Sequence, residues 1–599
     1  MGIPSYFSHI VKKHRHIIKK FNNLDKNINQ NIVNNLYLDS NSIIYDAVHA
    51  LPKDIPYAQI EDTLIQSVCD KLVYYITTLK PNHTVFIAFD GVAPIAKLDQ
   101  QRRRRYMTWF QSQMANSGGT LWNTSSITPG TSFMNLLGER IKLRFANPLE
   151  FGLTKIMISA TDEAGEGEHK IFEYIREFPE YHKNSVSVIY GLDADLIMLT
   201  LNHLHISDKM YLFRETPHFI KSLDNTLDPN SLYLLDIPTF GTFIMNDLQG
   251  ASASGTASAS GTASTASTAS TASTASTAST ASTASTASTA STASTASAGT
   301  NYNVLFDYIF ICFFLGNDFM PHFPALNIRT KGIDNLIYAY KNSLGIKNLY
   351  LTDGNKIIWK NLRKYIEFLA VNEHDYLLGE YKLREKMAKN NINKKPFHAS
   401  EAAAASKAAA SKAATSKSAA SKVEVVDDEL LLLPMKDRTV EVYIDPFEVG
   451  WRERYYSSLF DIKINDERCK EICINYLEGL EWTMNYYTTG CVDWRWTYKY
   501  HYAPLLVDLI KYVPYFDTYL LNVKSKNPVL PIVQLCYVLP RSSHYLLPQK
   551  VNALISKEHT DWYSTNCRFQ WAFCKYFWES HMDMPDINIG KLEQILLKV

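Results

Sequence analysis

The sequence predicts an α/β domain with a mostly parallel sheet flanked by helices, followed by a mainly helical, aromatic-rich region. At 599 residues the chain exceeds what one hydrophobic core normally holds, so we expect at least two domains. In the first half, short apolar runs alternate with amphipathic stretches, as they do in βαβ units. From about residue 440 onward, Trp and Tyr are frequent and helical periods dominate, as in CKEICINYLEGLEWTMNYY.

The composition indicates a globular, intracellular protein with no membrane role. Hydrophobic residues make up 46% of the chain, which is enough for large buried cores. Eight cysteines occur without a C-x-x-C pair, which favours reduced thiols and argues against structural zinc. The apolar run 308–316 is too short to span a bilayer, and the first residues lack the apolar part of a signal peptide. We expect a monomer, in the cytoplasm rather than the nucleus, and the sequence predicts no particular protein partner.

Two low-complexity stretches divide the chain. Residues 250–300 are an almost pure Ala-Ser-Thr repeat, and residues 401–422 are rich in Ala, Ser and Lys. Because the first stretch has no large apolar side chain to offset ordering entropy, we expect a flexible insertion there and an exposed connector in the second. The predicted units are an α/β core at 1–249 and 301–345, a connector at 346–439 and a second region at 440–599.

Four aspartates follow predicted strands. Asp39 ends the apolar run NLYLD, Asp90 follows TVFIAF, and Asp193 and Asp195 lie between an apolar strand and a helix in SVSVIYGLDADLIML. Ligands of open parallel sheets gather at the carboxyl ends of the strands. Asp193 and Asp195 are two residues apart, so an extended chain would point both to one face. Each acid alone is more often a helix cap or a surface residue, but the set indicates a ligand site.

Three further acids complete a predicted metal site. Glu166 and Glu168 lie in the glycine-spaced turn AGEGEHK before a helix, and Asp318 lies in FLGNDFMPH. Seven carboxylates in one cleft would repel one another unless cations intervened. Oxygen-only ligation, without His or Cys, favours Mg²⁺ or Mn²⁺ over zinc. Two such ions would activate a water and stabilise the leaving oxygen of a phosphodiester.

A basic stripe follows the strand that ends near Asp90. Pro94 suits the first turn of a helix, and PIAKLDQQRRRRYM continues it. The formal net charge is only +1, so contact with a polyanion depends on local patches such as this one. Arg102 and Arg103 should point away from the stripe, to solvent or to a backbone phosphate. The side chains on its face could bind a terminal phosphate: Lys97, Gln101, Arg104 and Arg105.

These motifs resemble a known family. MGIPSYF, LYLDSN, FIAFDGVAPIAKLDQQRRRR, GEGEHKI, YGLDADLIML and FLGNDFMPH are similar to the first conserved region of the Xrn-type 5′→3′ exoribonucleases. Residues 476–506, YLEGLEWTMNYYTTGCVDWRWTYKYHYAPLL, and VLPRSSHYLLP are similar to the second. The resemblance covers nearly all of the chain outside the two low-complexity stretches.

The resemblance implies a fold and an activity. The fold is a PIN/flap-endonuclease-like α/β core with the second conserved region packed against it. The activity is processive removal of mononucleotides from single-stranded 5′-monophosphorylated RNA, with two Mg²⁺ or Mn²⁺ ions and with capped ends excluded. It also implies that the seven acids bind metal, that Lys97 takes part in catalysis, and that the stripe is a 5′-phosphate pocket.

The resemblance further implies that two aromatic side chains stack on the terminal base. At the first of these two positions most members of the family have a histidine, and this chain has Tyr45. Since tyrosine also stacks on bases, the sandwich should persist. The second is Trp494 or Trp496, between which the sequence does not choose.

Two other functions are consistent with parts of the sequence. A flap-endonuclease-like DNA nuclease would share the acidic core, but the second region and the basic stripe argue against it. A catalytically inactive RNA-binding scaffold would not require all seven acids, which are present.

Overall fold

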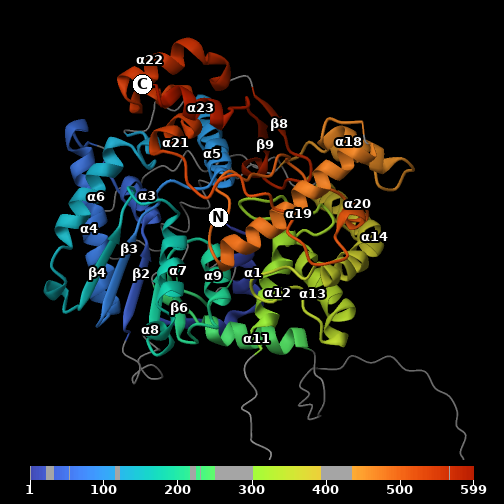
Figure 1. Ribbon diagram of the computed structural model, residues 1–599, viewed down its shortest axis with the longest axis horizontal. Helices are drawn as coiled ribbons and strands as arrows, with labels where there is room; N and C mark the ends of the chain where they lie inside the picture. Colours follow the sequence, from blue (N-terminus) through green and yellow to red (C-terminus); the bar gives the residue numbers. More distant parts are fainter. Residues whose placement is uncertain are drawn as a thin grey trace, which may run out of the picture.

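Seven strands form one sheet in the first half of the chain (Figure 1). The strand order is β1-β7-β6-β5-β2-β3-β4; β2 to β6 are parallel, and β7 runs antiparallel to β6 and β1. This confirms the predicted mostly parallel sheet. The strands are β1 (Ile18–Lys20), β2 (Asn35–Asp39), β3 (Thr84–Ala88), β4 (Lys155–Ser159), β5 (Ser187–Tyr190), β6 (Met210–Arg214) and β7 (Tyr233–Leu235).

The computed structural model describes most of the chain outside the low-complexity stretches. The predicted insertion 250–300 and the predicted connector segment 401–422 lie outside the described residues. The described ranges are 2–21, 33–52, 54–114, 122–215, 224, 226–228, 231–249, 301–392, 435–463, 465–564 and 567–598.

Helices cover both faces of the sheet because its strands are apolar on both sides. Alternate residues of β2 enter different cores: Leu36 and Leu38 pack on one face and Tyr37 on the other. One face is covered by α3 (Asn41–His49), α4 (Ile60–Leu79) and α6 (Ser132–Arg144). The other is covered by α7 (Gly167–Glu177), α9 (Asp195–Asn202), α11 (Ile237–Gln249) and α12 (Asn303–Cys312).

The second region is mainly helical, as predicted. No helix among the described residues is both long and apolar enough to cross a membrane. Helix α13 (Gly332–Ser343) lies in the last part of the first unit, and α14 (Trp359–Ile392) lies in the connector. The helices of the second region are α17 (Thr439–Ile444), α18 (Trp451–Leu459), α19 (Asp466–Thr488), α20 (Leu506–Leu509), α21 (Pro531–Val538), α22 (Gln549–Glu558) and α23 (Ile589–Leu596). The remaining elements include α1 (Tyr6–Lys13), α8 (Pro179–Lys183) and a hairpin of β8 (Arg568–Gln570) and β9 (His581–Asp583).

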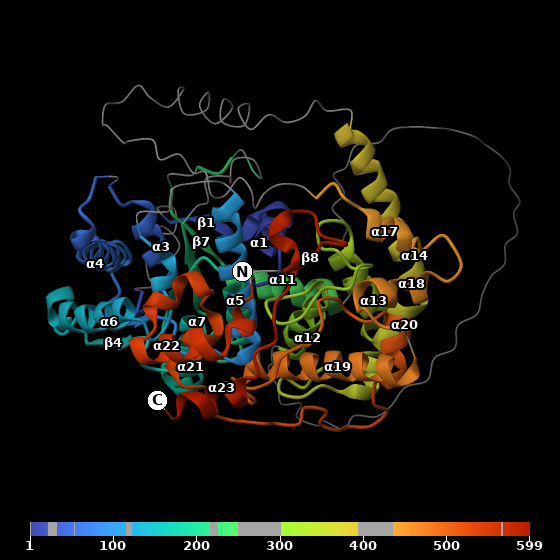
Figure 2. The same cartoon turned by 90° about the horizontal axis from the view of Figure 1, so that it is seen from above.

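Helix α5 (Ile95–Met114) joins the two regions. It begins directly after Pro94, as predicted, and stands at the end of the sheet beside α21 and α23 (Figures 1 and 2). Its first turns share a hydrophobic core with α21, and the Ala93 N–H donates to Gln534 Oε1 at 3.1 Å. The helix that carries the basic stripe is therefore held by residues from the far end of the chain.

The prediction for Arg102 is wrong. This side chain is buried, with 3% of its surface exposed, and its Nη2 donates to the Trp562 carbonyl at 3.1 Å. Its guanidinium also lies over the ring of Tyr537, 5.2 Å from the centroid. The second region folds back over this side of α5, which no local pattern in the arginine run indicates.

Arg102→Ala should destabilise the protein. The substitution leaves the Trp562 carbonyl without its donor and removes the cation–π contact, at a cost of about 2 kcal/mol. Calorimetric melting should show a lower transition temperature than for the wild type. Arg140→Ala, on an exposed position of α6, should leave the transition unchanged. Equal melting temperatures for the two variants would contradict the assigned role.

Candidate active site

All seven predicted acids lie at one end of the parallel sheet. β2 pairs with β5 although β3 and β4 come between them in the chain, so the strand order reverses there. Ligands of open α/β sheets bind at such a switch point, outside the carboxyl ends of the strands. The acids are Asp39 at the end of β2, Asp90 beyond β3, Glu166 and Glu168 at the start of α7, Asp193 before α9, Asp195 as its first residue, and Asp318 beyond the short helix Phe313–Leu315.

The structure brings the acids into two groups that share one lysine. Ligand atoms of Glu166 and Glu168 lie within 4.8 Å of one another, and those of Asp193, Asp195 and Asp318 do likewise. Lys97 lies between the groups: its Nζ is 2.5 Å from Glu166 Oε1 and 2.7 Å from Asp318 Oδ2. The predicted convergence of these side chains therefore occurs.

Asp193 and Asp195 converge by a different geometry from the predicted one. They do not lie in extended chain, because Asp195 begins α9 and its N–H donates to Asp193 Oδ1 at 3.3 Å. A tight turn, and not strand alternation, places both beside Asp318.

Close backbone approach at two glycines makes the site possible. A Cβ on Gly167 would lie 2.7 Å from Asp39 Oδ1, and the Gly167 N–H donates to Asp90 Oδ1 at 2.8 Å. Gly2 has φ +52°, and a Cβ there would lie 2.1 Å from Asp195 Oδ1. Glycine is thus required in both motifs, GEGEHK and MGIPSYF. The sequence analysis did not connect Gly2 to the site.

The acids perturb one another strongly. Burial, and then the charges of Asp90 and Glu166, raise the pKa of Asp39 to about 8. Burial and Asp195 raise the pKa of Glu168 well above its ordinary value. Burial also disfavours the charged form of Asp318, but nearby cations, with Lys97 first among them and Arg104 contributing, together outweigh it and lower the pKa of that carboxyl. Lys97 alone therefore does not neutralise these acids, and their charged forms require additional positive charge nearby.

The donor set fits divalent cations. Carboxylate oxygens are the ligands that Mg²⁺ and Mn²⁺ prefer. Glu168 Oε2 is buried and has no hydrogen-bond partner among the described residues, so it has a free lone pair. The carboxyls whose pKa is raised would regain their charged form next to a cation.

The second region contributes directly to the site. Tyr486 in α19 donates from its hydroxyl to Glu166 Oε2 at 2.6 Å, and its ring stacks on Trp482 with centroids 4.8 Å apart. Burial and the charge of Asp195 raise the pKa of the next residue, Tyr487, well above its ordinary value. The sequence analysis missed both tyrosines, because a Tyr pair in an aromatic helix is indistinguishable from core residues.

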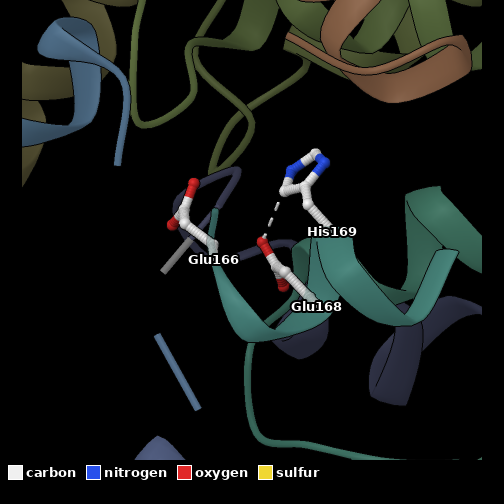
Figure 3. Close-up of side chains that lie close together, drawn as sticks. All are labelled: Glu166, Glu168 and His169. Carbon is white, nitrogen blue, oxygen red and sulfur yellow. Dashed lines mark ion pairs between the residues drawn. The ribbon is translucent and has the colours of Figure 1, made fainter. Parts of the chain in front are cut away.

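A histidine lies beside the acids, where the sequence predicted oxygen donors alone. His169 follows Glu168 in α7, is 9% exposed, and packs against Tyr486 with ring centroids 3.7 Å apart and the rings tilted by 40°. Its Nε2 lies 4.0 Å from Glu168 Oε1 (Figure 3). Burial lowers the pKa of His169 to about 3, so the imidazole is neutral at neutral pH.

The basic stripe lies beside the acids and has unused hydrogen-bonding capacity. Arg104 Nη2 is 3.8 Å from Asp318 Oδ1, and Arg105 Nη2 donates to the Ile127 carbonyl at 3.2 Å. Three stripe side chains have buried polar atoms without a hydrogen-bond partner among the described residues: Gln101 Oε1, Arg104 Nε and Nη2, and Arg105 Nε. Buried groups in this state indicate a ligand.

The three residues predicted to stack on a base differ in their exposure and in the groups that they contact. Tyr45 in α3 is 39% exposed and is close enough to Arg105 to favour its charged form. Trp496 is only 3% exposed and stacks on Trp482 with centroids 5.0 Å apart. Trp494 is partly exposed, and its carbonyl accepts from the Ile95 N–H at 3.1 Å, at the start of α5. Among the described residues, Tyr45 makes no ring contact with either tryptophan.

Comparison with known proteins matches both regions. A model of the XRN 5′-3′ exonuclease N-terminus matches residues 1–216, and a model of the Xrn1 helical domain matches residues 301–599. A 5′-3′ exoribonuclease 2 homolog of Drosophila melanogaster is 26% identical over all of this chain and 71% of its own length. The 5′-3′ exoribonuclease 2 of Arabidopsis thaliana is 26% identical over all of this chain and 67% of its own length. The 5′-3′ exoribonuclease 1 of Saccharomyces cerevisiae is 24% identical over 94% of this chain and 40% of its own length.

Tyr486→Phe should weaken metal binding. The variant keeps the ring stack but removes the hydrogen bond that orients Glu166, and loss of such a partner raises the dissociation constant by roughly 10-fold or more. Calorimetric titration with Mn²⁺ measures this. Tyr476→Phe is the matched control: it lies in the same helix, is equally buried, and its hydroxyl donates to the Pro321 carbonyl, not to an acid. Equal affinities for the two variants would contradict the positioning role.

Proposed function

The chain belongs to the Xrn family of 5′-3′ exonucleases, and we propose that it degrades single-stranded 5′-monophosphorylated RNA processively to mononucleotides. One observation carries this proposal: helix α5 bears both Lys97, which pairs with the acids, and the neighbouring basic stripe, whose arginines have buried donors without hydrogen-bond partners among the described residues. An end-binding pocket beside a hydrolytic centre limits cleavage to the end of a strand.

The seven acids would hold two Mg²⁺ or Mn²⁺ ions, which supply a hydroxide at neutral pH and stabilise the leaving oxygen. Tyr486 orients Glu166, and Gly167 orients Asp90 through its N–H. Lys97 lies between both acid groups, so its ammonium would face a scissile phosphate bound there. Burial of the site keeps bulk water from screening these charges.

Gln101, Arg104 and Arg105 would bind the 5′-phosphate. Guanidinium groups bind phosphate oxygens in pairs, and the unpartnered nitrogens of Arg104 and Arg105 are the donors for this. Arg105 is already fixed by the Ile127 carbonyl, which lowers the entropy cost of binding. A pocket shaped for one phosphate, with Asp318 at its wall, excludes the additional charge and bulk of a cap or a triphosphate.

Tyr45 and Trp494 would stack on the terminal base. Tyr45 is exposed beside Arg105, and Trp494 is partly exposed where α5 begins, so each borders the end of the phosphate stripe. Trp496 would not face the substrate, because its ring stacks on Trp482, which in turn stacks on Tyr486.

Hydrolysis should require a 5′-monophosphate and a divalent ion. We expect rapid release of mononucleotides from 5′-monophosphate RNA, slow release from 5′-hydroxyl RNA, none from capped RNA, and none with EDTA. Asp195→Asn should abolish release while RNA binding persists. A matched DNA strand should be a poor substrate, and equal cleavage of DNA would favour a flap-endonuclease-like enzyme. Turnover in EDTA would refute metal dependence.

Arg104→Ala should reduce the preference for 5′-phosphate over 5′-hydroxyl RNA. A charge-assisted hydrogen bond contributes about 1.5–3 kcal/mol, so the ratio of kcat/KM values should fall by roughly 10-fold or more. Arg103→Ala removes the same charge from a neighbouring position outside the stripe and should leave this ratio nearly unchanged. An unchanged ratio in Arg104→Ala would reject the phosphate pocket.

A further inference from the structure

We propose that His169 supplies a nitrogen ligand to the ion held by Glu166 and Glu168, so that this site takes Mn²⁺ in preference to Mg²⁺. The inference rests on the proposed function, since it concerns the same hydrolytic centre. It adds a residue that an all-carboxylate site does not include, and it makes the two ion sites chemically different.

The three side chains are arranged as ligands of one ion. Figure 3 shows Glu166, Glu168 and His169 at the start of α7, with the Glu168 carboxylate and the His169 ring turned toward each other. One ligand atom of each lies within 4.8 Å of the others, and His169 Nε2 is 4.0 Å from Glu168 Oε1. Ligands at about 2.0–2.2 Å from an ion lie up to about 4.3 Å apart when they face each other across it.

The hydrogen bonding of His169 differs from that of the other buried histidines nearby. His203 bonds through both nitrogens, to the Leu199 carbonyl at 2.7 Å and to Arg176 at 3.1 Å. His182 also bonds through both, to Tyr37 and to the Phe178 carbonyl. Nδ1 of His169 is buried and has no hydrogen-bond partner among the described residues, and the residue as a whole is 9% exposed.

Glu168, whose Oε1 lies 4.0 Å from His169 Nε2, also has a buried atom without a partner in the described part of the chain. Glu168 is 6% exposed, and its Oε2 has no hydrogen-bond partner among the described residues. Leaving buried polar groups unpaired is costly, and a cation between them would satisfy both at once. The tilted ring of Tyr486 packs against the imidazole, and the hydroxyl of the same tyrosine donates to Glu166.

Nitrogen ligation changes which metal the site prefers. Mg²⁺ is a hard cation that takes oxygen ligands, whereas imidazole favours first-row transition metals. Mn²⁺ also accepts carboxylates, so it fits a site with two glutamates and one histidine. The group of Asp193, Asp195 and Asp318 contains only oxygen donors and suits Mg²⁺.

Electron spin-echo spectroscopy of the Mn²⁺-loaded full chain tests this directly. We expect ¹⁴N modulation from a coordinated imidazole in the wild type. His169→Gln should lose the modulation, and Asp193→Asn, which alters only the other group, should keep it. By calorimetry, His169→Gln should raise the dissociation constant for Mn²⁺ by roughly 10-fold and that for Mg²⁺ much less.

The outcomes separate the two proposals. Mn²⁺ bound to the wild type without ¹⁴N modulation would overturn the His169 ligand while leaving the metal-dependent activity intact. Modulation that persists in His169→Gln would overturn it as well. Failure of the wild type to bind Mn²⁺ or Mg²⁺ at all would overturn the metal basis of the proposed function. The wild-type spectrum decides the question even if the variant does not fold.

Discussion

Seven carboxylates from five separate parts of the chain meet around one ammonium group, Lys97. Burial and mutual repulsion both disfavour their charged forms, and Lys97 offsets part of this cost by pairing with Glu166 and Asp318. Lys97 does not offset this cost completely, because burial and neighbouring acids still raise the pKa of Asp39 and Asp195. Such an arrangement is unfavourable for stability alone and is typical of a functional site.

Both regions of the chain contribute to this site. Tyr486 and Tyr487, consecutive residues of α19, face Glu166 and Asp195, which lie in different acid groups. Helix α5 bears Lys97 on one side and is held on another by Arg102 and the Trp562 carbonyl. The second region therefore positions the acids and the basic stripe as well as covering them.

Local patterns predicted the features that depend on local sequence. Apolar runs located the strands, and the break at Pro94 located the start of α5. The strand-end rule placed Asp39 and Asp90 correctly, because parallel strands bring their carboxyl ends to one edge. Glycine spacing around Glu166 marked a close approach that the structure shows at Gly167.

Contacts between distant segments were not predictable from one sequence. Arg102 belongs to a run of charge, yet its environment is set by residues more than four hundred positions away. Trp494 and Trp496 have the same local pattern, and only packing on Trp482 separates the buried Trp496 from the partly exposed Trp494. The sequence pattern gives His169 no special role, because its buried Nδ1, without a partner among the described residues, becomes apparent only in the folded chain.

The central claim is that these acids form a cation site shared by both regions. Anomalous diffraction from a crystal of the full chain equilibrated with Mn²⁺ tests it most directly. The account predicts manganese peaks at the Glu166–Glu168 group and at the Asp193–Asp195–Asp318 group, within coordination distance of their carboxylates. A map with no manganese near these carboxylates, at a concentration that saturates any binding, would contradict it.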